Sequence, residues 1–124
     1  MDKKKLLIVE DDAFIRDIYQ TRFQQEGFEV MTAENGLVAL EKMAQTIPDV
    51  VLLDVMMPYM DGMEVLKSIK ANERLKRVPV IMLTNVSEKI KIEQAYDFGA
   101  DELLTKSNFI PSEIVAKVRL LLKM

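Results

Sequence analysis

The chain has 124 residues, of which 49% are hydrophobic and 30% charged, so we expect one domain over residues 1–124 and no disorder. The net charge of −3 disfavours nucleic-acid binding by this chain, and no apolar run approaches the about 20 residues that span a membrane. Histidine and cysteine are both absent, which excludes a Ser-His-Asp triad, a disulfide framework and most zinc sites.

The first third of the chain alternates predicted strands and helices. Lys5–Glu10 (KLLIVE) contains four consecutive apolar residues and predicts a strand. Apolar residues at three-to-four spacing then predict a helix over Ala13–Glu26, which Gly27 ends. A second strand is predicted over Glu29–Ala33, followed by a helix over Gly36–Gln45 with an asparagine in the capping position.

The middle of the chain contains the most apolar predicted strand. Val50–Asp54 (VVLLD) is continuously apolar up to a final aspartate, which is typical of a central strand covered on both faces. The stretch Asp61-Gly-Met-Glu64 has the spacing of a capping box and predicts the start of a third helix. Val80–Thr84 (VIMLT) then predicts another buried strand.

The last third of the chain repeats this alternation. A fourth helix is predicted to start at Ser87 and Glu88 and to end near Gly99, followed by a short strand over Glu102–Thr105. Pro111 suits the first turn of a final helix. Five strand-helix units predict an α/β fold, with a parallel sheet covered by helices on both faces.

Polar residues follow the predicted buried strands. The first strand runs into the acidic residues 10–12, the third ends in Asp54, the fourth ends in Thr84, and Lys106 follows the fifth. Because the strands of a parallel sheet all end at one edge, most of these side chains are predicted to gather there. If the strand order is 2-1-3-4-5, the first and third strands are neighbours.

That strand order would bring Asp11, Asp12 and Asp54 together in one crevice. Three carboxylates repel one another, and the hard oxygen ligands predict a Mg²⁺ site. With Lys106 as a compact cation and Thr84 as a hydroxyl, the set is that of a phosphoryl-transfer site with Asp54 as nucleophile. Asp11 and Asp12 also precede a helix, where aspartate is a favoured N-cap, so the alternative of capping stays open for both.

The sequence resembles the receiver domains of response regulators, of the stand-alone single-domain type, over essentially its whole length. The resemblance implies a flavodoxin-like doubly wound (βα)5 sandwich with a sheet of order 2-1-3-4-5. The segment LLDVMMPYMDG is highly specific for this family. The segments that carry the resemblance are LLIVEDDAFIR, PDVVLLDVMMPYMDGMEVLKSIK, VPVIMLTN and FGADELLTKSNF.

The resemblance implies a role for the acidic residues in two-component signalling. Asp54 would accept a phosphoryl group from a phosphohistidine on a sensor histidine kinase or phosphotransfer protein. Asp11 and Asp12 would hold Mg²⁺ together with Asp54 and the backbone carbonyl of Met56. Such a domain catalyses only its own phosphorylation and dephosphorylation and is otherwise not an enzyme.

The resemblance also implies how the signal would be transmitted. Lys106 would pair with a phosphoryl oxygen, and Thr84 would move toward the phosphoryl group. The face formed by the fourth helix, fifth strand and fifth helix would then change shape to control a downstream protein. A homodimer could form through the same face. We expect a cytoplasmic protein that binds neither nucleic acid nor membrane.

Three positions depart from the family pattern. Leu103 stands where the family usually has an aromatic switch residue, three positions before the lysine. Ser107 replaces the usual proline, so we predict a trans Lys106–Ser107 peptide bond. Asn85 stands where the family often has alanine or glycine. Leu103 and the altered loop after Lys106 motivate an alternative hypothesis, a phosphorylation-independent protein-interaction module on the same fold.

Two other readings of the pattern have less support. A flavodoxin-type flavin carrier needs a loop that cradles phosphate after the first strand, but here that loop is acidic. A haloacid-dehalogenase-type phosphatase needs a second acid two residues after its nucleophile, where this chain has Met56.

Overall fold

The structure, a computed structural model, describes residues 3–84, 89–106 and 110–124. Five strands alternate with five helices along these residues, as predicted. The elements in chain order are β1 (Lys5–Val9), α1 (Ala13–Gln25), β2 (Glu29–Ala33), α2 (Gly36–Gln45), β3 (Val50–Asp54), α3 (Gly62–Ala71), β4 (Val80–Thr84), α4 (Lys89–Asp97), β5 (Glu102–Thr105) and α5 (Pro111–Leu121).

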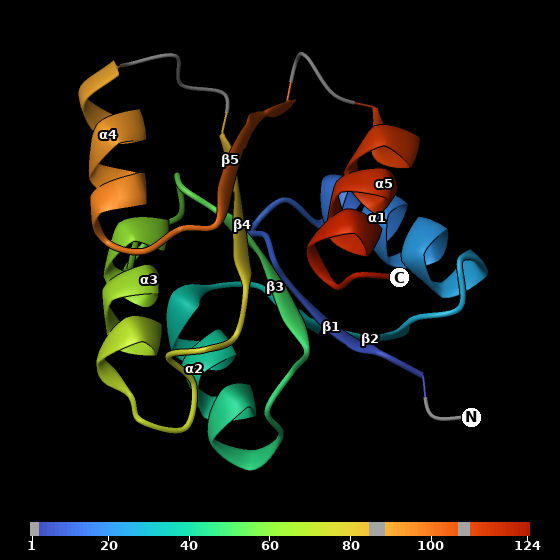
Figure 1. Cartoon of the computed structure of the whole chain (residues 1–124), viewed down its shortest axis with the longest axis horizontal. Helices are drawn as coiled ribbons and strands as arrows, with labels where there is room; N and C mark the ends of the chain where they lie inside the picture. The colour runs from blue at the N-terminus through green and yellow to red at the C-terminus, as the bar shows by residue number, and fades with distance from the viewer. Residues whose placement is uncertain (1–2, 85–88, 107–109) are drawn as a thin grey trace.

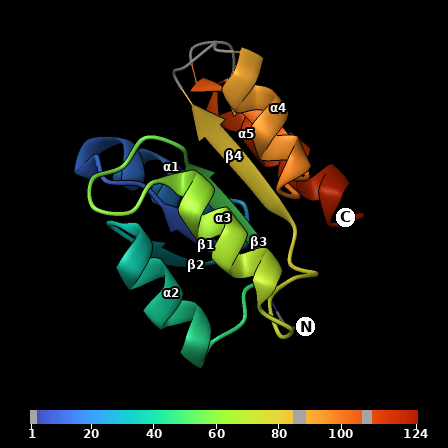
Figure 2. The same ribbon diagram turned by 90° about the vertical axis from the view of Figure 1, so that its left-hand side faces the viewer.

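The strands form one parallel sheet in the order β2-β1-β3-β4-β5, which confirms the predicted topology. Helices α1 and α5 lie on one side of the sheet and α2, α3 and α4 on the other (Figure 1). After a quarter turn, the three helices of the second side face the viewer (Figure 2). The sheet therefore reverses its order between β1 and β3, where a ligand site is expected in a doubly wound fold.

The three central strands are buried on both faces, which explains their continuous apolar sequences. In β3, Val51 and Leu53 join the core on the α2-α3-α4 side, whereas Val50 and Leu52 join the core under α1 and α5. The same alternation holds along β1 and β4. A polar residue at the end of such a strand is thus held in place by a rigid apolar support.

Most predicted helix ends are confirmed. The side chains of Asn35 and Asp61 accept hydrogen bonds from backbone N–H groups in the first turns of α2 and α3. Gly27 follows α1 with φ of 93°, a conformation that glycine adopts without steric cost. Within the described part of the chain, no helix combines the length and the apolar character that a membrane crossing needs.

Two predicted boundaries are wrong by one residue. Strand β1 ends at Val9 rather than Glu10, because its ladders with both neighbouring strands stop there. Helix α1 ends at Gln25, and Glu26 is its C-cap. The predicted start of the fourth helix at Ser87 and Glu88 lies outside the described residues.

Candidate functional site

The carboxyl edge of the sheet brings the predicted polar residues together. Asp54 and Thr84 are the last residues of β3 and β4, and Lys106 directly follows β5. Glu10 directly follows β1, the neighbour of β3. Glu10, Asp54 and Thr84 are the polar residues buried in the described part of the chain. The buried polar residues of the fold thus concentrate at one edge of the sheet.

Asp54 is the centre of this site, and its side chain is buried at the end of β3. The residue is 6% exposed, and its Oδ2 lies 3.3 Å from the Nζ of Lys106. Its Oδ1 accepts a long hydrogen bond of 3.4 Å from the backbone N–H of Met56. A buried carboxylate at the end of an apolar strand is stable because a cation lies beside it.

The loop after β3 folds back tightly against Asp54. The backbone N–H of Gly62 donates to the carbonyl oxygen of Val55 at 2.9 Å. A Cβ atom on Gly62 would lie 2.2 Å from the carbonyl oxygen of Asp54, which is closer than a carbon atom can approach. Glycine at this position therefore allows the start of α3 to lie against the end of β3.

Lys106 is shared between two buried carboxylates. Its Nζ donates to Oε1 of Glu10 at 2.6 Å, in addition to its contact with Asp54. Burial lowers the pKa of Lys106, but the two carboxylates outweigh this effect and raise the pKa overall. Lys106 is therefore a stable cation that links the end of β5 to the ends of β1 and β3.

Glu10 is the least satisfied group of the site. It is 3% exposed, and its Oε2 is buried without a hydrogen-bond partner among the described residues. Burial raises the pKa of Glu10, and the neighbouring Asp54 raises it further, against an opposing effect of Lys106. A buried carboxylate oxygen without a donor calls for another positive group, because desolvation otherwise remains uncompensated.

The geometry of the carboxylates fits a divalent cation. Glu10, Asp11 and Asp54 each offer one oxygen atom, and the three oxygens lie within 4.8 Å of one another. Asp11 is exposed, so the group opens to solvent. Oxygen donors alone, with room for water, suit Mg²⁺ better than a softer metal. The donor set and the unpartnered oxygen of Glu10 therefore both fit a magnesium ion.

The structure distributes the acidic residues 10–12 differently from the sequence prediction. Asp12 is the N-cap of α1, and its Oδ1 accepts hydrogen bonds from Phe14 and Ile15 at 2.9 and 3.1 Å. Glu10, which the prediction left out, takes the place beside Asp11 and Asp54. The signal for Glu10 was its position directly after the buried strand, which predicts a buried side chain.

Thr84 and Met56 lie where the sequence placed them. Thr84 is buried at the end of β4 and pairs in register with Thr105, next to Lys106. Met56 is exposed, and its backbone faces Asp54 through the hydrogen bond described above. The metal-binding role of its carbonyl and the switch role of Thr84 stay predictions.

Of the three positions that depart from the family pattern, the structure describes Leu103. Its side chain packs against the core on the α4 side of the sheet, and its backbone N–H donates to the hydroxyl of Tyr96 at 3.2 Å. Asn85 and Ser107 lie outside the described residues, and so does the predicted trans bond before Ser107.

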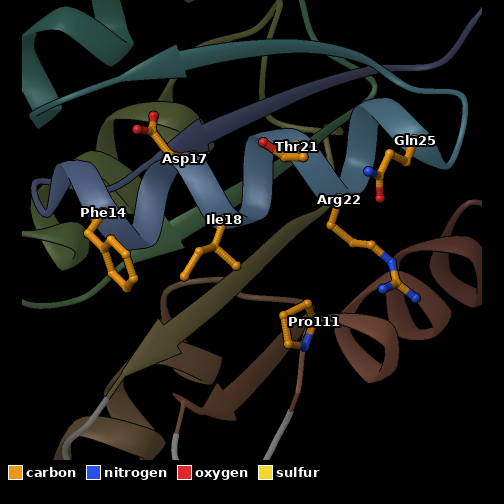
Figure 3. Close-up of a pocket in the computed structure, with 7 residues that line it drawn as sticks. All are labelled: Phe14, Asp17, Ile18, Thr21, Arg22, Gln25 and Pro111. Atoms are coloured by element: carbon orange, nitrogen blue, oxygen red, sulfur yellow. The ribbon is translucent and has the colours of Figure 1, made fainter.

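A groove runs along α1 to the first residue of α5 (Figure 3). It has a volume of about 500 Å³, and Phe14, Ile18, Arg22 and Pro111 are among its lining residues. Phe14 is 75% exposed although it is a large apolar side chain. Because α1 begins directly after the acidic residues 10–12, this apolar surface is close to the carboxylate group in the sequence.

Comparison with known proteins gives a consistent result. The sequence model described as "Response regulator receiver domain" matches residues 6–119. The chain is 41% identical to the transcriptional regulatory protein CpxR homolog of Haemophilus influenzae over 96% of this chain and 50% of that protein. It is 36% identical to the alkaline phosphatase synthesis transcriptional regulatory protein PhoP of Bacillus subtilis, over 97% and 49%.

Solved structures show the same similarity in three dimensions. The chemotaxis protein CheY4 of Vibrio cholerae has a TM-score of 0.90 and 32% identity, and the match covers 96% of this chain and 98% of CheY4. The present chain thus corresponds to almost all of one relative. In contrast, it spans about half the length of the curated relatives above.

Proposed function

The chain belongs to the family of response regulator receiver domains, and from this premise we propose that it is a phosphorylation-controlled switch whose phosphoacceptor is Asp54. The observation that carries the proposal is the position of Asp54. Its buried carboxylate ends a rigid central strand, 3.3 Å from a lysine and within 4.8 Å of two further carboxylates. A nucleophile, a cation and a metal-binding group meet there.

In the proposed reaction, an Oδ of Asp54 attacks the phosphorus atom of the donor. A new P–O bond forms as the bond to the donor's leaving group breaks, and Asp54 becomes an acyl phosphate. Lys106 neutralises a phosphoryl oxygen, and the hydroxyl of Thr84 hydrogen-bonds another. Both groups are already at the carboxyl edge, so little reorganisation is needed.

The proposed cofactor is Mg²⁺, which when bound would neutralise the charge that develops on the phosphoryl oxygens. Asp11 and Asp54 would hold it together with the backbone carbonyl of Met56. We assign the remaining acidic position to Glu10 rather than Asp12. The carboxylate of Asp12 caps α1, whereas Glu10 has a buried oxygen without a donor among the described residues.

The groove on α1 supports a protein as phosphodonor. An exposed phenylalanine and isoleucine one helical turn apart form an apolar patch on α1, the helix that follows the acidic residues 10–12, and such patches mark protein contacts. We propose that a sensor histidine kinase or phosphotransfer protein docks there and presents its phosphohistidine to Asp54. The setting would be the cytoplasm, where such a donor acts.

The output surface is proposed to be α4, β5 and α5. Lys106 follows β5 directly, so a change at the phosphoryl site would be transmitted first to this strand. Leu120 on α5 is exposed and offers an apolar contact for a downstream protein or a second copy of the chain. The curated relatives are transcriptional regulators about twice as long, so the identity of the downstream partner depends on the whole protein.

Leu103 favours a second candidate function, a protein-interaction module that ignores phosphorylation. Without an aromatic ring on β5, the customary coupling between the phosphoryl site and the output surface lacks one component. This candidate predicts equal partner affinity with and without a phosphoryl mimic.

Labelling with acetyl phosphate tests the acceptor assignment. Intact-protein mass spectrometry should find one phosphoryl group on the natural chain in the presence of Mg²⁺, and none in EDTA or on the Asp54→Asn variant. Asp61→Asn is a matched control, because asparagine caps a helix as well as aspartate does. Equal labelling of Asp54→Asn and the natural chain would refute the assignment.

A further inference from the structure

Helix α4 is fastened to the rest of the fold near its C-terminal end. Ala95 is fully buried in the core, and the hydroxyl of Tyr96 accepts a hydrogen bond from the backbone of Leu103. Just beyond the helix, the Nζ of Lys67 lies over the ring of Phe98, 4.4 Å from its centroid, in a cation–π contact. These contacts hold α4 against α3 and β5 on the side of the sheet that faces the viewer in Figure 2.

The hydrogen bond from Leu103 to Tyr96 lies on the outer edge of the sheet. Strand β5 is the last strand and pairs with β4 alone. Alternate N–H groups of an edge strand point away from their neighbour and need a partner. The N–H of Leu103 finds this partner in Tyr96, whose side chain crosses from α4 to the strand.

Leu103 is also the position at which this chain lacks the aromatic residue of its family. It lies three residues before Lys106, which contacts Asp54 and Glu10. The ring that reaches this part of β5 comes instead from α4. A change in β5 that starts at Lys106 would therefore act on Tyr96 within three residues, and through it on α4.

The hydrogen bond between Leu103 and Tyr96 is weak enough to break and re-form as the domain changes conformation. Tyr96 is 46% exposed, so water can replace Leu103 as a partner of its hydroxyl. A hydrogen bond of ordinary net strength changes an equilibrium constant by about two- to tenfold. Such a contact can bias a two-state equilibrium without fixing it.

We propose that the hydrogen bond between Tyr96 and Leu103 is a latch that holds α4 on β5 in the unphosphorylated domain and is released when Asp54 is phosphorylated. Tyr96 is thus a positioning residue that acts on the acceptor site through β5 and Lys106. The inference deepens the proposed function and rests on it, since it assumes that Asp54 responds to a phosphoryl group.

The opposite edge of the sheet offers a purely structural comparison. There, Nζ of Lys42 on α2 donates to the carbonyl oxygen of Thr32 on β2. Strand β2 carries none of the acceptor-site residues, so this contact only covers an open edge. If Tyr96 had the same limited role, loss of its hydroxyl would loosen the edge without any effect on Asp54.

The decisive variant is Tyr96→Phe, which removes only the hydroxyl group. Beryllofluoride with Mg²⁺ serves as the phosphoryl mimic, its affinity measured by titration, and NMR hydrogen exchange reports on the amide of Leu103. We expect about two- to tenfold tighter beryllofluoride binding and faster exchange at Leu103, because the resting state loses a contact that the active state lacks. Tyr59→Phe, at an exposed tyrosine, is the matched control and should match the natural chain.

Each other result overturns the proposal. Faster exchange at Leu103 with unchanged beryllofluoride affinity would show that Tyr96 only satisfies the edge of β5 and has no effect on the site at Asp54. Tighter or weaker binding with unchanged exchange would show that the hydrogen bond is not the cause. If the natural chain itself does not bind beryllofluoride, the proposed function is wrong. If the natural chain binds it and Tyr96→Phe binds it with the same affinity, only the proposed role of Tyr96 is wrong.

Discussion

Replacement of Glu10 by glutamine should stabilise the metal-free domain. In the natural chain, Oε1 of Glu10 accepts from Lys106 at 2.6 Å, while Oε2 is buried without a donor in the described part of the chain. Glutamine keeps an oxygen for Lys106 and adds an NH₂ group, which can donate to the carboxylates of Asp11 or Asp54. The substitution thus removes one of three mutually repelling charges and satisfies a buried position.

The magnitude follows from the contacts that remain. A buried polar atom without a partner costs about 1–3 kcal/mol. Lys106 retains Asp54 at 3.3 Å, so its charge stays compensated after the substitution. We therefore expect the free energy of unfolding at pH 7 to rise by about 1–2 kcal/mol, which corresponds to a melting temperature higher by about 4–8 °C for a domain of this size.

The gain should depend on pH in a defined direction. Burial and Asp54 raise the pKa of Glu10 in the folded state above its usual value of 4.5. The folded natural chain therefore binds more protons than the unfolded chain between that value and the raised pKa, and its stability falls as the pH rises through this window. Glutamine does not titrate, so its advantage should grow with pH from about 4.5 upward and become constant above the folded pKa.

Thermal unfolding followed by circular dichroism, in EDTA and in Mg²⁺, measures both effects. Mg²⁺ should raise the melting temperature of the natural chain, because it binds the folded site, and should raise that of Glu10→Gln much less. Glu41→Gln on the exposed face of α2 is the matched control and should behave like the natural chain. A Glu10→Gln variant that is less stable in EDTA, or that responds fully to Mg²⁺, would refute this account of the site.

Substitutions at three further positions test local features of the structure. Asp12→Ala should lower the free energy of unfolding by about 1 kcal/mol through loss of the α1 cap, while Asp12→Asn should keep both stability and the response to Mg²⁺ in melting experiments. A lost Mg²⁺ response in Asp12→Asn would instead identify Asp12 as a ligand. Gly62→Ala should cost about 1–3 kcal/mol in urea unfolding, because its Cβ would meet the carbonyl oxygen of Asp54 at 2.2 Å; an unchanged midpoint would contradict that contact. Tyr59→Gly should gain about 1 kcal/mol in the same assay, because Tyr59 has φ of 68° and its side chain is 90% exposed; a loss of stability would mean that the ring makes a contact that outweighs this strain.

The fold was predictable because each strand carries a pattern with one physical meaning. Val50–Asp54 is apolar at consecutive positions, and only a strand covered on both faces buries them all. The edge strand β2 contains fewer apolar residues than β3 and is more exposed, as its sequence predicts. The exact ends of elements were less certain, since the residues beyond Val9 and Gln25 retain backbone hydrogen bonds to the elements they leave.

Which of the acidic residues 10–12 lie beside Asp54 was harder to predict, because the answer depends on the exact end of β1. Successive side chains of an extended segment point in opposite directions, so a shift of one residue exchanges a buried carboxylate for an exposed one. Strand β1 ends at Val9, which leaves Glu10 buried and places Asp12 at the start of α1. A sequence prediction that extends the strand by one residue assigns the second carboxylate to Asp12 instead.

The contact between Tyr96 and Leu103 could not be predicted from the sequence at all. It depends on the rotation of α4 about its axis, and Ala95 is the only buried residue among positions 92–97 of this helix, too few to fix that rotation by an apolar pattern. The absence of an aromatic residue at Leu103 was visible in the sequence. The origin of the ring that reaches this strand was visible only in three dimensions.

The distribution of contacts around Lys106 connects the acceptor site to this latch. In the unphosphorylated domain, Nζ of Lys106 lies closer to Glu10, at 2.6 Å, than to Asp54, at 3.3 Å. Phosphorylation of Asp54 would replace the single carboxylate charge by a phosphoryl group with about 1.5–2 negative charges and three acceptor oxygens, so it should draw the lysine away from Glu10. Because Lys106 directly follows β5, this shift moves the end of the strand that carries Leu103. In the proposed switch, the balance between Glu10 and Asp54 for one lysine would thus decide how strongly phosphorylation acts on the contact with Tyr96.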